Sequence, residues 1–231
     1  QRVRLGRYDD WRLPFNSDSG FYSEILLMDD LQSPRTVRDY ENYIARLNDI
    51  PRYFREQIAN IRVGIRDGFT LPREIVGGVS QVIGGLRYEN AEAMGLYAPF
   101  ANFPATVPES ERARLREAGH AAITNNVIPA FDEFRAFFET EYAPRTRTTI
   151  AAQRLPNGRA YYADLVRYYT TLPDATPQQV HQIGLREVAR IRAAMETEMR
   201  ESDFQGSFPE FLTFLRTDPQ FYAISPEQLL R

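Results

Sequence analysis

The sequence predicts an all-α fold, a multi-helix array of antiparallel helix hairpins. Three observations lead to this prediction. Apolar residues recur every three or four positions through several long segments, which is the period of an amphipathic helix. A serine or threonine followed by proline marks several helix starts. No segment alternates apolar and polar residues over the length that a half-buried strand requires.

Residues 1–32 are expected to form an irregular N-terminal segment, since Pro14, Asn16 and Gly20 interrupt any period there. The helical region is expected to span residues 33–231 and to begin at Ser33-Pro34. Pro51 is expected to end the first helix and open a second, which stops at Gly68. So short a connection predicts an antiparallel hairpin. The apolar faces of the two helices are Val37, Tyr40, Ile44 and Leu47, then Phe54, Ile58, Ile61 and Ile65.

The segment from residue 72 to 87 predicts a weaker helix, because it contains four glycines at about 1 kcal/mol each relative to alanine. We expect another helix to approach closely at these small residues. The run around Ser80 matches neither a phosphate-binding loop nor a nucleophile turn. The glycines are Gly77, Gly78, Gly84 and Gly85.

A loop over 97–108 precedes a long predicted helix over 109–142, with a bend expected at Pro129. Its second half carries an aromatic stripe that could line a ligand groove. Core packing is the expected explanation, because every packed helix shows one apolar stripe. The stripe is Val127, Phe131, Phe134, Phe138 and Tyr142.

After a second loop over 144–158, a short tyrosine-rich helix is expected over 159–171. Thr176-Pro177 then opens the clearest helix of the chain, which extends to Arg200. Its apolar face predicts that Val188 and Ile191 belong to the core. Ion pairs are expected on its outer face, Glu187 with Arg190 and Glu196 with Arg200. Two further capping boxes begin at Ser207 and Ser225.

Composition excludes several classes of function. The net charge of −3 argues against a nucleic-acid binder, which needs a basic face. No run of about 18 apolar residues is present, so no membrane span is expected. The chain has no cysteine and no lysine, and all 28 cations are arginine. Thiolate nucleophiles, Schiff-base chemistry and a phosphate-loop lysine are therefore excluded.

Histidine is scarce, with only His120 and His181 in the chain. They lie on different predicted helices without partners at ligand spacing, and no HExxH motif occurs. We therefore expect no catalytic residues, no metal ligands and no cofactor within this chain. His181, near the start of its helix, could donate a hydrogen bond to a substrate or relay a proton; packing beside the helix start is the more ordinary explanation.

Several sequence blocks resemble the bacterial DUF885 family. The run Asp39-Tyr40-Glu41-Asn42-Tyr43 with Pro51 and the run Tyr97-Ala98-Pro99-Phe100 are similar to it. A more specific match is the block Gly158-Arg159-Ala160-Tyr161-Tyr162 through Arg167-Tyr168-Tyr169, Thr176-Pro177, His181 and Glu187-Val188, continuing to Asp218-Pro219 and Phe221-Tyr222. The connection Thr171–Asp174 is longer than the family's usual step, a difference that should alter only a loop.

The family is similar to thermolysin-like zinc peptidases. Its members have an HE-x-x-P-G-H-type helix and a downstream Glu-Gly-Trp segment, and both lie C-terminal to the region that this sequence matches. The resemblance therefore implies the N-terminal to middle part of a zinc-dependent peptidase, a cleft wall facing a zinc helix that these residues do not contain. Zinc is implied for the full-length protein only, and we expect the chain alone to be inactive. The implied partners are a peptide substrate and the C-terminal half of the same protein.

Four residues are candidates for substrate contact under this resemblance: Tyr161, Tyr162, Arg167 and His181. Arginine suits a peptide carboxylate, and tyrosine hydroxyls suit a developing oxyanion. The resemblance implies export, as to the periplasm, although a cytoplasmic location stays open. The alternative function is a non-enzymatic helical module that binds another protein through its aromatic faces. The helix started at Ser225 further leads us to expect a longer natural chain, whose next part covers residues 161–169.

Overall fold

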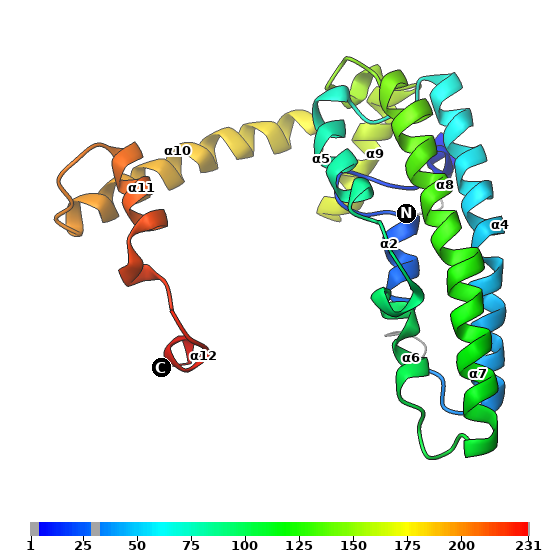
Figure 1. Ribbon diagram of the computed structural model, residues 1–231. Coiled ribbons are helices and arrows are strands. Elements are labelled where there is room, and N and C mark those ends of the chain that lie inside the picture. Colours follow the sequence, from blue (N-terminus) through cyan, green and yellow to red (C-terminus); the bar gives the residue numbers. More distant parts are fainter. Residues whose placement is uncertain (1–4, 29–32, 231) are drawn as a thin grey trace. The chain divides into compact units, whose positions relative to one another are not determined.

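The computed structural model describes residues 5–28 and 33–230, and over these residues the secondary structure is helical (Figure 1). In the described part, pairing between extended segments is limited to isolated bridges, Phe15 with Gly20 and Pro72 with Arg147. The prediction of an all-α fold is confirmed. The chain divides into two compact units, Gln1–Tyr168 and Tyr169–Arg231. The boundary expected between residues 32 and 33 adjoins residues outside the described part and stays a prediction.

The first unit is built on long helices that surround an aromatic core. Its N-terminal segment, expected to be irregular, contains the short 3₁₀ turns Gly6–Tyr8 and Asp10–Arg12 and helix α2. Phe21 and Tyr22 of α2 are fully buried, so this segment belongs to the core. The α-helices described for this unit are α2 (Phe21–Leu26), α4 (Val37–Asp67), α5 (Arg73–Gly84), α6 (Ala98–Ala101), α7 (Glu109–Ala122), α8 (Ile128–Phe137) and α9 (Gly158–Thr170), whose last two residues fall in the second unit.

Helix α4 runs without interruption through Pro51, so the hairpin predicted at this proline is wrong. Pro51 removes one backbone donor, but the buried face keeps its helical spacing on both sides of it. One continuous helix therefore buries a single stripe, which outweighs the lost hydrogen bond. The helix starts at Thr36 rather than Ser33: its hydroxyl accepts from the Asp39 backbone N–H (3.2 Å), and Asp39 accepts from the Thr36 backbone N–H (2.9 Å). Gly68, at φ 73°, ends it as expected.

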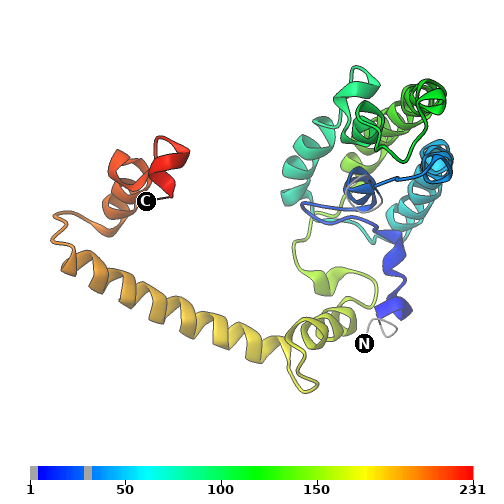
Figure 2. The same ribbon diagram turned by 90° about the horizontal axis from the view of Figure 1, so that it is seen from below.

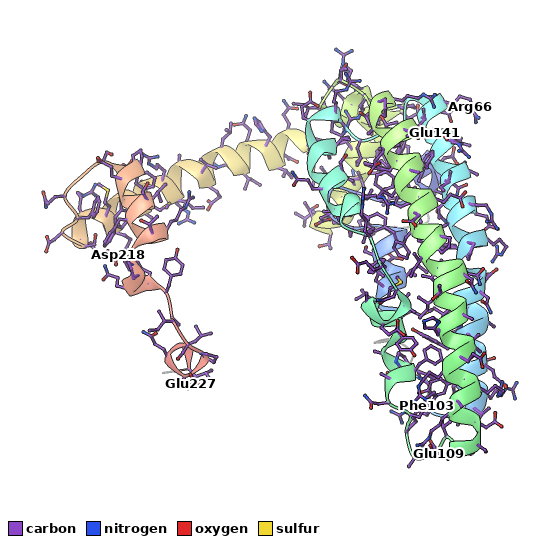
Figure 3. All side chains as sticks on the ribbon, in the orientation of Figure 1. Arg66, Phe103, Glu109, Glu141, Asp218 and Glu227 are labelled. Carbon is purple, nitrogen blue, oxygen red and sulfur yellow. The ribbon has the colours of Figure 1, made fainter. Side chains whose placement is uncertain are left out.

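Helix α4 and the α7–α8 segment, the longest helical segments of the first unit, pack parallel to each other rather than as an antiparallel pair. Polar contacts join Glu41 to Arg114 (2.9 Å), Asn48 to Asn126 (2.9 Å) and Arg62 to Glu141 (2.6 Å), so contacts follow the same order along α4 and along the segment from α7 to Tyr142. Figure 3 shows Arg66 and Glu141 at one end of the pair and Glu109 at the other. Figure 2 confirms that α4 and the α7–α8 segment lie side by side. The hairpin was predicted at Pro51 only, so the parallel packing of α4 with the α7–α8 segment is a feature that the sequence analysis did not predict.

The helix predicted over 109–142 is observed with two π-helical turns, Ile123–Val127 and Phe138–Tyr142. The first comes directly before Pro129, whose missing N–H disturbs the regular ladder where a bend was expected. The aromatic stripe is buried, with Phe134, Phe138 and Tyr142 fully enclosed. The expectation that this stripe packs into the core is confirmed. Tyr142 also accepts a hydrogen bond from the Leu71 backbone N–H (2.8 Å).

Helix α5 forms where expected, but its glycines do not support a close helix contact. A Cβ added at Gly77, Gly78 or Gly84 would meet no atom within 4 Å. The side of α5 that packs inward carries Val76, Val79 and Ile83. Among the described residues no helix makes the close approach predicted at these glycines, because the apolar side chains rather than the glycines face the core.

The second unit contains α10 (Pro177–Glu201), α11 (Phe208–Thr217) and α12 (Pro226–Leu229). The Thr176 hydroxyl accepts from the Gln179 backbone N–H (3.2 Å), confirming the predicted cap of α10. The Phe204 ring lies 5.2 Å from the rings of Phe211 and Phe214, which forms a small aromatic cluster. Within the described residues, no helix combines the length and apolar character needed to cross a membrane.

The prediction that Val188 and Ile191 belong to the core is wrong in this structure. Their exposed fractions are 68% and 46%, and no residue of α10 is buried. The helix is amphipathic as predicted, but most of its apolar face meets no partner within the second unit. Glu187 pairs with Arg190 as expected (2.9 Å), whereas Glu196 pairs with Arg192 (2.6 Å) instead of the predicted Arg200.

Candidate functional site

The tyrosine-rich helix α9 is held to the N-terminal segment by one carboxylate, Asp164. The Tyr8 hydroxyl donates to Asp164 Oδ2 (2.7 Å), and the Arg7 guanidinium pairs with the same oxygen. Arg167, one turn further along α9, donates to Asp164 Oδ1 (2.8 Å). Only 11% of the Asp164 side chain is exposed. Asp164 thus links residues that are about 160 positions apart in the chain.

The electrostatics of this cluster favour an ionised Asp164. The hydrogen bond from Tyr8 holds the pKa of the Asp164 carboxyl below its ordinary value, and the hydrogen bonds from Arg167 and Arg7 act in the same direction. Partial burial opposes them without reversing the shift. The cluster is therefore a charge-assisted anchor for α9 at neutral pH.

Tyr161, a predicted substrate contact, also packs against this anchor. Its ring lies 5.2 Å from the Tyr8 ring and 5.7 Å from the Phe69 ring, centroid to centroid. Such separations are typical of favourable aromatic pairs. Tyr161 is half-buried, so the structure gives it a packing role besides any contact with a substrate. Its predicted role in binding stays a prediction.

The other two candidates on α9 face different directions. Arg167 lies three residues after Asp164, so the two share one side of the helix, and 41% of its side chain is exposed. Tyr162 lies two residues before Asp164, about 160° around the helix at ~100° per residue. It is 46% exposed. The structure therefore brings Tyr161 and Arg167 together around Asp164, and it places Tyr162 on another face.

His181 belongs to the second unit, whereas the other three candidates belong to the first. It is exposed near the start of α10. The prediction of a role for His181 in substrate binding is therefore independent of the geometry around Asp164.

A separate groove of about 610 Å³ lies on α7, next to the first π-helical turn. Tyr97, Arg116, His120 and Asn125 are among its lining residues. His120 Nε2 lies 3.5 Å from the Glu92 carboxylate, and its ring meets the Tyr97 ring edge-on at 6.2 Å. This groove offers polar groups to a small ligand, and π-helical turns recur at functional sites.

The described residues do not fit a zinc site. Across residues 5–28 and 33–230, no three histidine or carboxylate side chains are grouped so that they could hold a metal ion. A catalytic zinc site needs three protein ligands.

Sequence reasoning missed the most connected residue of the site, Asp164. Its spacing of three residues from Arg167 on a helix is a local signal that could have indicated the pair. Its partners Arg7 and Tyr8 are 157 and 156 residues away, and no spacing rule links them to α9.

The fold and the site together define the class of this protein. Its described residues form an all-helical fold, in which the ionised Asp164, bound by Tyr8 and Arg7, anchors the tyrosine-rich helix α9. The chain belongs to the family of bacterial proteins of unknown function DUF885, whose model matches residues 2–231. The earlier resemblance to this family is confirmed. No curated protein matches the chain in sequence.

A solved structure from Colwellia psychrerythraea, described as a "putative lipoprotein", is similar in fold, with a TM-score of 0.79 and 22% sequence identity. The match covers 93% of this chain and 37% of that one. At this level of identity the likeness concerns the fold. The chain thus spans well under half the length of that relative.

Proposed function

We propose that this chain is the helical N-terminal to middle part of a zinc-dependent peptidase and forms one wall of its substrate cleft. The observation that carries the proposal is the geometry of α9. The helix is fixed from one side by Asp164 with Tyr8 and Arg7, and it presents Tyr162 and Arg167 at the surface. A rigid helix with exposed donors suits a cleft wall, because positioned donors bind without further reorganisation.

Arg167 is the proposed contact for a carboxylate of the peptide. Its guanidinium carries five N–H donors in a planar fork, of which the bond to Asp164 uses part. Asp164 also fixes its direction, which lowers the entropy lost on binding. The Tyr162 hydroxyl would donate to a peptide carbonyl from its own face of the helix. The zinc-binding helix would come from residues outside these 231, because the described residues do not fit a metal.

Export is part of the proposal. The relative of similar fold is described as a "putative lipoprotein", and lipoproteins are exported proteins. We propose that this chain also works outside the cytoplasm, in the periplasm or attached to a membrane surface facing it.

The test uses the protein expressed with its natural downstream sequence. We expect it to hydrolyse peptides in the presence of zinc and to lose this activity with a chelator. In Arg167→Gln the KM for peptides with a free carboxylate should rise about 10- to 100-fold. This ratio corresponds to the free energy that a charge-assisted hydrogen bond contributes to binding. The matched control is Arg154→Gln, on an exposed turn before α9, which should leave KM unchanged. A longer protein without zinc-dependent hydrolysis, or equal KM values for both variants, would contradict the proposal.

A second candidate, a helical interaction module, is favoured by one observation, the uncovered apolar face of α10. Exposed apolar patches mark sites of association. This function predicts a protein without hydrolytic activity at any metal concentration, so the same assay separates the two candidates.

A further inference from the structure

The first turns of α10 carry an apolar face that no other part of the second unit covers. Val180, Gly184, Val188 and Ile191 follow one another at helical spacing, so they form a single stripe. All four are exposed. Exposure of so regular a stripe on a well-capped helix is unusual, because helices of this kind gain most of their stability from packing that face.

The same stripe is packed at its far end. Met195 and Met199 continue it and are half-buried. The neighbouring Arg192 lies over the Phe208 ring of α11, with its guanidinium carbon 3.7 Å from the ring centroid. Helix α11 therefore covers the last part of the stripe, and an established packing surface continues directly into the uncovered part.

A groove of about 810 Å³ widens the uncovered surface at its start. It is formed by the turn before α10 and by the first turns of the helix, with Leu172, Val180 and Ile183 exposed along it. Gln182 and Arg186 border it. An apolar floor with a polar border is the usual composition of a packing interface.

We propose that this surface, named the α10 docking face and consisting of Val180, Ile183, Gly184, Val188 and Ile191, is covered by a helix from the C-terminal remainder of the same longer protein. The length of chain available supports this occupant, since the matched fold makes up only 37% of the related Colwellia chain. A Cβ at Gly184 would meet no atom within 4 Å, so a helix backbone can approach there. The continuity with the α10–α11 packing favours an intramolecular partner. The proposal goes beyond the proposed function, because it concerns assembly and needs no activity.

The absence of cysteine from the sequence makes the test direct. Val188→Cys places a thiol on the docking face, and Ala189→Cys places a matched control about 100° around the same helix turn. Ala189 is exposed as well. Trypsin releases both positions in the same four-residue peptide, Glu187–Arg190, so mass spectrometry reads maleimide labelling of either variant identically.

In the 231-residue chain we expect both thiols to react at similar rates. In the protein with its natural downstream sequence, Val188→Cys should react at least 10-fold more slowly than Ala189→Cys. Equal rates in the longer protein would overturn the proposal. Slow labelling of Val188→Cys already in the 231-residue chain would overturn it as well. If that protection depended on protein concentration, a second copy of the chain would cover the face. If it did not, the first unit would cover the face. Val180→Cys, two helical turns earlier, provides the same comparison should Val188→Cys fail to fold.

Discussion

Two glycines of the first unit should respond with opposite signs to the same substitution. Gly64 lies in the last turns of α4, where a Cβ would be 2.5 Å from the Arg12 carbonyl oxygen and 2.9 Å from the Phe69 carbonyl oxygen. Gly77 lies in α5, where a Cβ would meet no atom within 4 Å. Both are helical, so alanine changes the helix propensity equally at the two positions.

The magnitudes follow from this difference. Alanine is favoured over glycine in a helix by about 1 kcal/mol, so Gly77→Ala should stabilise the fold by about 0.5–1 kcal/mol. At Gly64 the same gain is opposed by overpacking, which costs about 1–3 kcal/mol. The obstructing atoms are backbone oxygens that cannot rotate away. A shift of the Arg12 backbone would also strain its 2.9 Å ion pair with Asp67. The expected net effect of Gly64→Ala is a loss of up to about 2 kcal/mol.

The assay is urea unfolding followed by far-ultraviolet circular dichroism and by tryptophan fluorescence. Trp11 is the only tryptophan in the chain and adjoins Arg12, so its emission reports on the contact with Gly64. The midpoint should fall for Gly64→Ala and rise for Gly77→Ala, with unchanged slopes. Equal or greater stability of Gly64→Ala, or a clear loss for Gly77→Ala, would refute the reasoning from Cβ environments.

Two further predictions concern buried polar groups. Tyr142→Phe should lower the free energy of unfolding by about 1–3 kcal/mol, because the buried Leu71 N–H loses its acceptor; urea unfolding measures this. In the folded protein the pKa of Asp164 lies below its ordinary value, chiefly because the Tyr8 hydroxyl donates a hydrogen bond to it. The ionised carboxylate therefore stabilises the fold above about pH 4. This contribution is lost as the pH falls through the folded pKa. Asp164→Asn should therefore lower stability at pH 7 and flatten the acid limb of stability against pH.

Each of these two variants has its own comparison. Tyr162→Phe removes an exposed hydroxyl from α9 and should change stability by less than about 0.5 kcal/mol. A comparable loss for Tyr142→Phe and Tyr162→Phe would contradict the burial argument. For Asp164→Asn, an acid limb as steep as that of the unsubstituted protein would show that another carboxylate carries the pH dependence.

Local sequence signals predicted most helices well. The cap at Thr176, the stop at Gly68 and the buried stripe through Phe134 follow from residues within a few positions of one another. Pro51 misled the prediction because its local cost is real, but the continuous buried stripe on both sides of it decides the outcome. Propensity is a local quantity, and burial of a whole face overrides it.

The candidate site was less accessible from sequence. The tyrosines and Arg167 could be selected by resemblance, but their anchor could not, because Asp164 meets Tyr8 and Arg7 only after the chain has folded. The same limit applies to α10. Periodicity identifies Val188 and Ile191 as one face of a helix, and it carries no information on whether a partner for that face lies within the same residues.

The parallel arrangement of α4 with the α7–α8 segment has a consequence for the order of folding. Residues that meet across this pair are separated by 73 to 79 positions in the chain, as for Arg114 with Glu41 and Arg62 with Glu141. An antiparallel hairpin would instead have joined neighbours through a short turn. The loop-closure entropy of the whole connection between the two helices must therefore be lost before their contacts form. Although its secondary structure is helical, the first unit should fold at rates closer to those of proteins with non-local topology than to those of simple helical bundles.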